Sequence, residues 1–223
     1  IKEPDLWLYG SPVYAGRLPA VVTETLRQLP LPTKPRPAFA LVTYGNRDMG
    51  VALQELVSLL EQCGHQVAGA AAFIGEHSYS AAFPIARQRP DTDDLIQAEA
   101  VGRLAKEQLQ KRRPHSPLAV PGQLGVIERM LPSKGPQPEL LVGLCNRCGK
   151  CVKRCPMGCL DDQTFDYIEA KAKQRCLGCV ACVKGCPKQA RTYRFPALIR
   201  PLLGRYLRKA MDVRQQPCWY FPS

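Results

Sequence analysis

Long apolar runs are missing from this chain of 223 residues, and the longest is far shorter than the ~18 residues that a membrane-spanning helix needs. A secretory signal is missing as well, although the chain starts at Ile1, which we interpret as the start of a fragment or of a processed product. No cluster of side chains typical of acid–base catalysis stands out. What is present is the ordinary balance of a soluble globular protein, with 45% hydrophobic and 22% charged residues.

Cysteine is scarce outside one short region. Nine of the eleven cysteines lie between positions 145 and 186, while Cys63 and Cys218 stand alone. A secreted disulfide scaffold spreads its cysteines through a small domain, whereas tight C-x2-C repeats in a longer chain favour metal ligands. Reduced, metal-ligating cysteines predict a cytoplasmic protein.

Two cysteine-rich segments form an internal repeat. "CNRCGKCVKRCP" (145–156) and "CLGCVACVKGCP" (176–187) share four cysteines, the final proline and a Val-Lys pair. In the spacing C-x2-C-x2-C-x3-C-P, three cysteines wrap one cubane 4Fe–4S cluster, and the fourth is directed to the other cluster. The repeat therefore predicts two clusters with crossed ligands, Cys145, Cys148, Cys151 and Cys186 for one, and Cys176, Cys179, Cys182 and Cys155 for the other.

Smaller features of the repeat fit the same chemistry. We expect Gly149 and Gly178 to let backbone amides approach the inorganic sulfides, and Pro156 and Pro187 to turn the chain after the exchanged ligand. Zinc is the alternative metal, although zinc motifs normally use two separated CxxC pairs. Cys159 falls outside both registers, and we interpret it as a small buried residue, with an alternative ligand or a redox thiol as the other interpretations.

Positive charge is also unevenly distributed. Residues 1–140 hold 15 basic and 14 acidic side chains, whereas residues 141–223 hold 16 and 5. Most of the formal charge of +12 therefore lies with the cysteines. Two oxidised cubanes with four thiolates each carry about −2 apiece, so part of the surplus compensates the clusters. The remainder favours a redox partner protein with an acidic docking surface over nucleic acid or an anionic membrane surface.

The segment before the cysteines, residues 1–109, alternates short apolar runs with helical patterns. Buried strands are expected at 5–10, 38–45 and 66–75, and helices at Leu18–Leu29, Val51–Cys63 and Asp94–Gln110. Gly64 stands where a helix stop belongs. Strands that alternate with helices over short connections predict a parallel sheet covered by helices.

Three further segments complete the organisation. Residues 110–140 contain six prolines and three glycines and are expected to form a linker, with a short helix at 124–131. Residues 141–195 contain the two clusters, and residues 196–223 are expected to form a basic helix and tail.

Two resemblances follow from these motifs. The cysteine segment resembles the bacterial dicluster ferredoxins, with all eight ligand positions matched. "DLWLYGSPVYAGRLP", "ALVTYGNRDMG" and "AAAFIGEHSYS" resemble the third, fourth and fifth strands of the flavodoxin fold with the loops that follow them. Together they resemble flavodoxin–ferredoxin fusion redox proteins. The implied fold is α/β with a small α+β part: a partial flavodoxin-like parallel sheet (strands 3–5) followed by a dicluster ferredoxin-like domain.

The flavodoxin resemblance implies FMN as a second cofactor, at the carboxyl ends of the strands. Either Tyr14 or Tyr44 would stack on the flavin ring, and backbone amides nearby would tune it; the alternative is that both are loop tyrosines without a ligand. His77 is expected to act as a hydrogen-bonding loop residue. The implied flavin-binding residues are Ser11, Pro12, Val13, Tyr14, Ala15, Gly16, Tyr44, Gly45, Asn46 and Asp48.

One part of the flavodoxin pattern is absent from these residues. A flavodoxin holds the FMN phosphate in the loop between its first strand and first helix, and the resemblance here begins at the third strand. We therefore expect a chain truncated at its start, with one exposed edge on its first strand, and FMN only where the missing segment is restored.

These features predict an electron-transfer protein that relays electrons through two 4Fe–4S clusters, to or from FMN. The alternative is a subunit of a flavin and iron–sulfur oxidoreductase that acts on a small substrate. A nucleic-acid or membrane-surface module based on the basic tail is less well supported, because charge runs usually form solvated faces.

Overall fold

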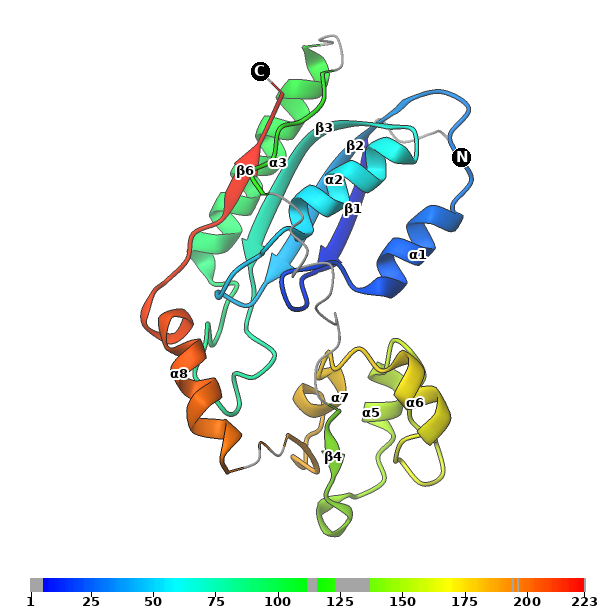
Figure 1. Ribbon diagram of the computed structural model, residues 1–223, viewed down its shortest axis with the longest axis vertical. Helices are drawn as coiled ribbons and strands as arrows, with labels where there is room; N and C mark the ends of the chain where they lie inside the picture. The colour runs from blue at the N-terminus through cyan, green and yellow to red at the C-terminus, as the bar shows by residue number, and fades with distance from the viewer. Residues whose placement is uncertain (1–5, 112–115, 123–136, 194, 196, 223) are drawn as a thin grey trace. The chain divides into compact units, whose positions relative to one another are not determined.

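The computed structural model describes residues 6–111, 116–122, 137–193, 195 and 197–222. The helix expected at 124–131 and most of the expected linker lie outside the described residues. The chain divides into two compact units, one made of residues 1–133 and 207–223 and the other of residues 134–206. Figure 1 shows the helices and strands of both units.

The first unit is built on a parallel sheet. Its parallel strands are β1 (Trp7–Pro12), β2 (Arg36–Tyr44) and β3 (His65–Ile74), in the order β1-β2-β3. Each lies where the sequence predicts a strand, with ends shifted by one or two residues. Among the described strands β1 ends the sheet, which agrees with the expected open edge.

Helices cover both faces of this sheet. α1 (Ala20–Gln28) and α2 (Ala52–Gln62) lie on one face, and α3 (Thr92–Gln110) lies on the other (Figure 1). Alternation along β2 assigns the two faces, because Ala38 and Ala40 join the core cluster that contains α2, whereas Phe39 joins the cluster that contains Val101 of α3. The structure is therefore a mixed α/β fold with a parallel-containing sheet.

The ends of the helices follow local sequence signals. Gly64 follows α2 with a left-handed φ of +79°, which is the helix stop that the sequence predicts. α3 begins with a capping box, in which the Asp94 amide donates to Asp91 Oδ1 at 3.2 Å and the Asp91 amide donates to Asp94 Oδ2 at 3.0 Å.

The C-terminal segment returns to the first unit. The sequence predicts a basic helix and tail over residues 196–223. The structure has helix α8 (Ile199–Asp212) and then strand β6 (Cys218–Tyr220), which pairs antiparallel with β3. β6 was not predicted, because three residues between prolines carry no usable alternation.

Buried polar side chains fix this return. Asn46 Nδ2 donates to Ala210 O at 2.8 Å and to Val213 O at 2.7 Å. Arg89 Nε donates to Asp94 Oδ2 at 2.7 Å, and Arg89 Nη1 donates to Gln215 O at 2.9 Å. The Arg89 guanidinium holds the pKa of the Asp94 carboxyl below its usual range. The last turn of α8 and the residues after it are thus bound to the loops at the carboxyl end of the sheet.

The second unit consists of short elements around the cysteines. Its elements are β4 (Glu139–Leu140), a 3-10 turn (Val142–Leu144), α5 (Lys150–Arg154), α6 (Glu169–Arg175), α7 (Ala181–Lys184) and β5 (Arg191–Thr192). β4 and β5 form an antiparallel pair, so the two ends of the cysteine region meet. α5 and α7 each carry the third cysteine of one repeat.

Candidate iron–sulfur sites

The two cysteine repeats have the same backbone conformation. Left-handed φ values occur at three pairs of matching positions, namely Arg147 (+55°) and Gly178 (+61°), Gly149 (+69°) and Val180 (+58°), and Gly158 (+56°) and Gln189 (+51°). Only half of these residues are glycine. The left-handed conformation is therefore a shared feature of both repeats and is not explained by glycine alone. Left-handed residues beside right-handed ones turn successive amides to one side, which forms a concave site for an anion.

Each third cysteine lies in the first turn of a short helix. Gly149 precedes α5 and Val180 precedes α7, both in the left-handed conformation. Matching hydrogen bonds run from Lys153 N to Gly149 O (3.1 Å) and from Lys184 N to Val180 O (3.0 Å). A β-branched residue such as Val180 is rarely left-handed, which makes this position a strained one that the surrounding contacts must maintain.

The fourth cysteine of each repeat accepts a hydrogen bond from the amide four residues later. Cys159 N donates to Cys155 Sγ, and Ala190 N donates to Cys186 Sγ, both at 3.2 Å. Cys159 is therefore the counterpart of Ala190, and both side chains are buried. Burial, with a smaller effect of the neighbouring Cys155, raises the pKa of the Cys159 thiol to about 11. This geometry supports the interpretation of Cys159 as a small buried residue.

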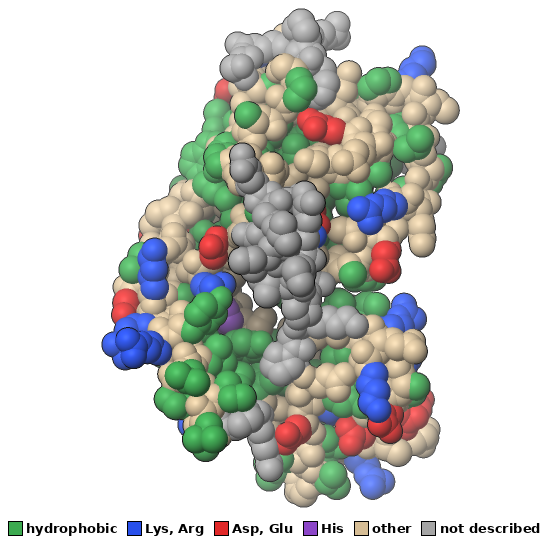
Figure 2. Space-filling model, in the orientation of Figure 1, with side chains coloured by type: hydrophobic (Ala, Val, Ile, Leu, Met, Phe, Trp, Pro, Cys, Tyr) green, Lys and Arg blue, Asp and Glu red, His purple; other side chains and the backbone are tan. Residues whose placement is uncertain are grey.

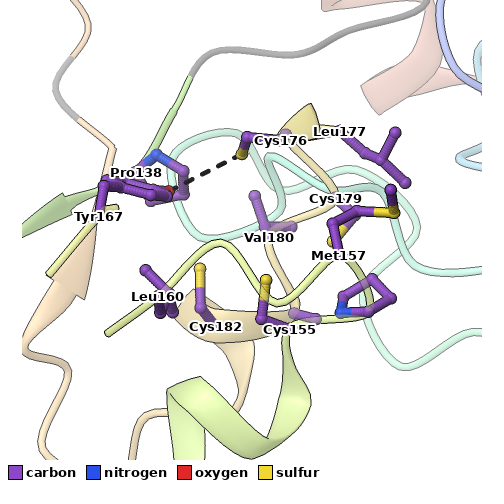
Figure 3. A pocket seen from close by; sticks show the side chains of 13 residues that line it. Pro138, Cys155, Met157, Leu160, Tyr167, Cys176, Leu177, Cys179, Val180 and Cys182 are labelled. Atoms are coloured by element: carbon purple, nitrogen blue, oxygen red, sulfur yellow. Dashed lines mark hydrogen bonds between the residues drawn. The ribbon is translucent and has the colours of Figure 1, made fainter. Parts of the chain in front are cut away.

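One cavity brings cysteines of both repeats together. Figure 3 shows Cys155 of the first repeat beside Cys176, Cys179 and Cys182 of the second, with Val180 among them. The cavity has about 340 Å³ of atom-free space, part of it open to solvent. Burial is the main effect that raises the pKa of Cys179, and it raises the pKa of Cys182 to about 11. The four thiols are the set that the spacing assigns to one cluster.

The donors in this cavity fit a cluster. A cubane offers four irons at separate corners, each of which takes one thiolate, so its cysteines surround a cage. Among the described residues, no three His, Cys, Asp or Glu side chains are arranged to hold a single metal ion. Four other cysteines are assigned to the cluster outside this cavity. Of these, Cys151 is buried, Cys145 and Cys186 are half-buried and Cys148 is exposed.

Two residues beside the cavity were not predicted from the sequence. Tyr167 lines the cavity, and its Oη lies 4.0 Å from Cys176 Sγ. Arg191 is buried, and its guanidinium carbon lies 5.1 Å from the centre of the Tyr167 ring. A comparison of the repeats beyond the Cys-Pro pair would have found Arg191, because it occupies the position of Leu160 in the first repeat.

The residues predicted to face a flavin lie at the carboxyl end of the parallel strands. Pro12 ends β1, and Val13 N donates to Thr43 O at 2.9 Å. Tyr14 and Arg17 exchange backbone hydrogen bonds of 3.0 and 3.1 Å across a turn in which Ala15 and Gly16 are left-handed. Ser11 is buried, and its Oγ donates to Pro12 O at 2.9 Å.

Two of these predicted residues use their side chains for contacts within the protein. Tyr44 is 9% exposed and belongs to the hydrophobic core, where burial is the main effect that raises its pKa to about 12. Asn46 is buried; besides its bonds to Ala210 O and Val213 O, its Oδ1 accepts from Gln215 N at 2.9 Å. The Tyr44 ring is therefore not available to stack on a flavin, and the Asn46 side chain is not available to a ligand.

The remaining loop residues form a tight turn. Asp48 Oδ1 accepts from Gly50 N at 2.8 Å, and Val51 N donates to Gly16 O at 3.0 Å. A side chain at Gly50 would approach Gly16 O to 2.4 Å, so the two loops contact each other through glycine. Gly45 packs against His77, whose Nδ1 accepts from Tyr79 N at 3.0 Å.

Comparison with protein families agrees with the cysteine geometry. A family model described as a 4Fe–4S dicluster domain matches residues 144–191. No curated protein matches the chain. Residues 144–191 are thus a 4Fe–4S dicluster domain of ferredoxin type, and such a domain supports iron–sulfur electron transfer.

Proposed function

We propose that this chain is an electron-transfer protein whose domain at 141–195 relays electrons through two 4Fe–4S clusters. Cys145, Cys148, Cys151 and Cys186 hold one cluster, and Cys176, Cys179, Cys182 and Cys155 hold the other. The observation that carries the proposal is the cavity lined by Cys155 together with three cysteines of the second repeat. When bound, such a cluster accepts and releases single electrons.

The chain's own residues bind the clusters and control their surroundings. The left-handed residues Gly158 and Gln189 precede the amides that donate to Cys155 Sγ and Cys186 Sγ, and hydrogen bonds of this kind help to set the potential. Val180 and Leu160 line the cavity and are buried, so they limit the access of water to it. Solvent exposure is the other main determinant of the potential, so the burial of these side chains is part of the function.

The proposal predicts about eight irons and about eight acid-labile sulfides per chain after anaerobic purification. Each complete set of four cysteines binds one Fe4S4 unit, which gives this stoichiometry. Colorimetric iron and sulfide assays, with zinc measured by mass spectrometry, provide the test. A stoichiometric zinc content with little iron would rule the cluster proposal out.

We further propose that electrons pass to or from a flavin held by the first unit, as in a flavodoxin-like domain. Its three parallel strands, covered by helices on both faces, support this, because ligands of such sheets lie at the carboxyl ends of the strands. The proposed flavin contacts are Tyr14, the turn at Ala15 and Gly16, and the loop at Gly45 and Asp48. The second candidate function is the reduction of a small substrate at the flavin. Turnover of such a substrate by the protein alone would distinguish it from electron transfer.

A redox partner with an acidic surface is proposed from the charge of the cluster-bearing part. Four basic side chains of α8 are exposed, and they lie beside exposed apolar ones such as Leu202 and Tyr206. Figure 2 shows basic and hydrophobic side chains together over α8. Among the described helices, none has the length and apolar character needed to cross a bilayer.

Opposite charges steer two proteins toward each other, and salt screens this attraction over a Debye length of ~10 Å at 0.1 M. We therefore expect electron transfer to an acidic acceptor to slow at least about tenfold between low and moderate ionic strength. Stopped-flow reduction of an acidic and of a basic acceptor gives the comparison. Equal rates at both ionic strengths would mean that the positive charge only compensates the clusters.

A further inference from the structure

Arg191 is a buried cation beside the cysteine cavity. It is 2% exposed, and among the described residues of the second unit it is the only buried side chain that carries a charge. A charge that leaves water loses favourable hydration, which close partners must replace. The partners of Arg191 therefore determine how strongly its charge acts on neighbouring groups.

Those partners neutralise Arg191 only in part. Nη1 donates to Pro138 O at 3.5 Å and Nη2 donates to Phe165 O, but both acceptors are neutral carbonyls. Nε is buried without a hydrogen-bond partner. Its carboxylate partner Asp166 lies 3.5 Å from Nη1, and the Asp166 side chain is 56% exposed, so water weakens the pairing.

The position of Arg191 directs its charge toward one cluster site. The guanidinium lies against the Tyr167 ring, and the Tyr167 hydroxyl lies 4.0 Å from Cys176 Sγ. Tyr167 and Cys176 both line the cavity, so the charge of Arg191 lies next to this cluster site.

The two repeats differ at this position. Leu160 occupies the place in the first repeat that Arg191 occupies in the second, five residues after the fourth cysteine. Leu160 is buried like Arg191 but has no charge. The near twofold symmetry of the domain is therefore broken by one buried positive charge.

We propose that Arg191 separates the reduction potentials of the two clusters by favouring reduction of the one held by Cys155, Cys176, Cys179 and Cys182. The inference rests on the proposed function. A one-electron donor is oxidised and the cluster becomes one unit more negative, and a fixed positive charge stabilises this state more than the oxidised one. Electrons that enter the domain then collect at this cluster, which gives the relay a preferred order.

The test is an EPR-monitored redox titration of the full chain, loaded with its clusters and reduced by dithionite. Arg191→Met removes the charge and keeps most of the side-chain volume. We expect the reduction equilibrium constant of one cluster to fall roughly tenfold, or about 59 mV for a one-electron couple, with a clearly smaller shift of the other. The shifted signal must be the one that Cys179→Ser removes.

Two variants separate charge from structure. Arg191→Lys keeps the charge and should keep most of the potential. Arg175→Gln removes an exposed cation next to Cys176, and its effect should be small because water screens an exposed charge. An equal fall in Arg191→Lys and Arg191→Met would overturn the inference, since it would assign Arg191 a purely structural role.

Iron content distinguishes the two levels of the proposal. If the wild-type chain holds no clusters, the proposed function fails; if Arg191→Met holds its full iron and both potentials stay unchanged, only the inference about Arg191 fails. If Arg191→Met does not load, Asp166→Asn takes its place. That variant removes the partial counter-charge and should raise the same potential, and an unchanged potential with full iron would contradict the inference.

Discussion

Replacement of Cys155 by serine is expected to remove the cluster bound by Cys176, Cys179 and Cys182, and to leave the cluster nearer in sequence intact. Cys155 lines the cavity with those three cysteines, although 21 residues separate it from the first of them. Iron should fall from about eight toward about four per chain, with one of two EPR signals lost. The corresponding change in the second repeat, Cys186→Ser, should remove the other signal.

Matched variants identify the affected cluster without an independent assignment of the spectra. The spectrum of Cys155→Ser should match that of Cys179→Ser, and the spectrum of Cys186→Ser should match that of Cys148→Ser. Cys159→Ala is the control, because it installs the residue that the second repeat carries as Ala190, and both signals should survive. If Cys155→Ser instead resembled Cys148→Ser, the crossed pairing would be wrong.

FMN and riboflavin are expected to bind this chain equally weakly. A phosphate dianion is held best by a helix N-terminus with free amide donors. In the loops proposed to face the flavin ring, the amides of Tyr14, Arg17, Gly50 and Val51 already donate to protein oxygens. The phosphate therefore gains little, and the two dissociation constants should agree within about threefold, or less than about 1 kcal/mol.

Titration followed by quenching of flavin fluorescence measures both constants. Tyr14→Ala should weaken both flavins alike if this ring stacks on the flavin, whereas the exposed Tyr206, changed to alanine, should have no effect. FMN that binds a hundredfold more tightly than riboflavin would reveal a phosphate site in these residues. Absence of any flavin binding would remove the flavin from the proposed relay.

Much of the sheet could be predicted because hydrophobic period and chain order determine it. Three apolar runs became β1, β2 and β3, and the helical patterns between and after them became α1, α2 and α3. The same period would also have placed Tyr44 correctly, since it continues the inward series Ala38, Ala40, Val42. Tyr44 was instead assigned to a flavin by resemblance, and that assignment overlooked the alternation.

Other features depend on contacts that no local pattern carries. β6 forms because three residues pair with the free edge of β3. Asn46 is buried because Arg89 and residues more than 160 positions later supply its partners. The assignment of the cysteine ligands stays a prediction from spacing, which is possible because a cluster fixes the separation of its ligands. Arg191 required a comparison of the repeats beyond that spacing.

The return of the C-terminal segment to β3 has a consequence for biosynthesis. Domains tend to fold in the order in which the ribosome produces them, yet here residues 134–206 leave the ribosome before residues 207–223 that complete the first unit. Asn46 and Arg89 therefore lack their last partners until the C-terminal residues have left the ribosome. A chain cut after residue 206 would keep every proposed cluster ligand but would leave unpaired the edge of β3 that β6 covers, and such an edge is prone to aggregate.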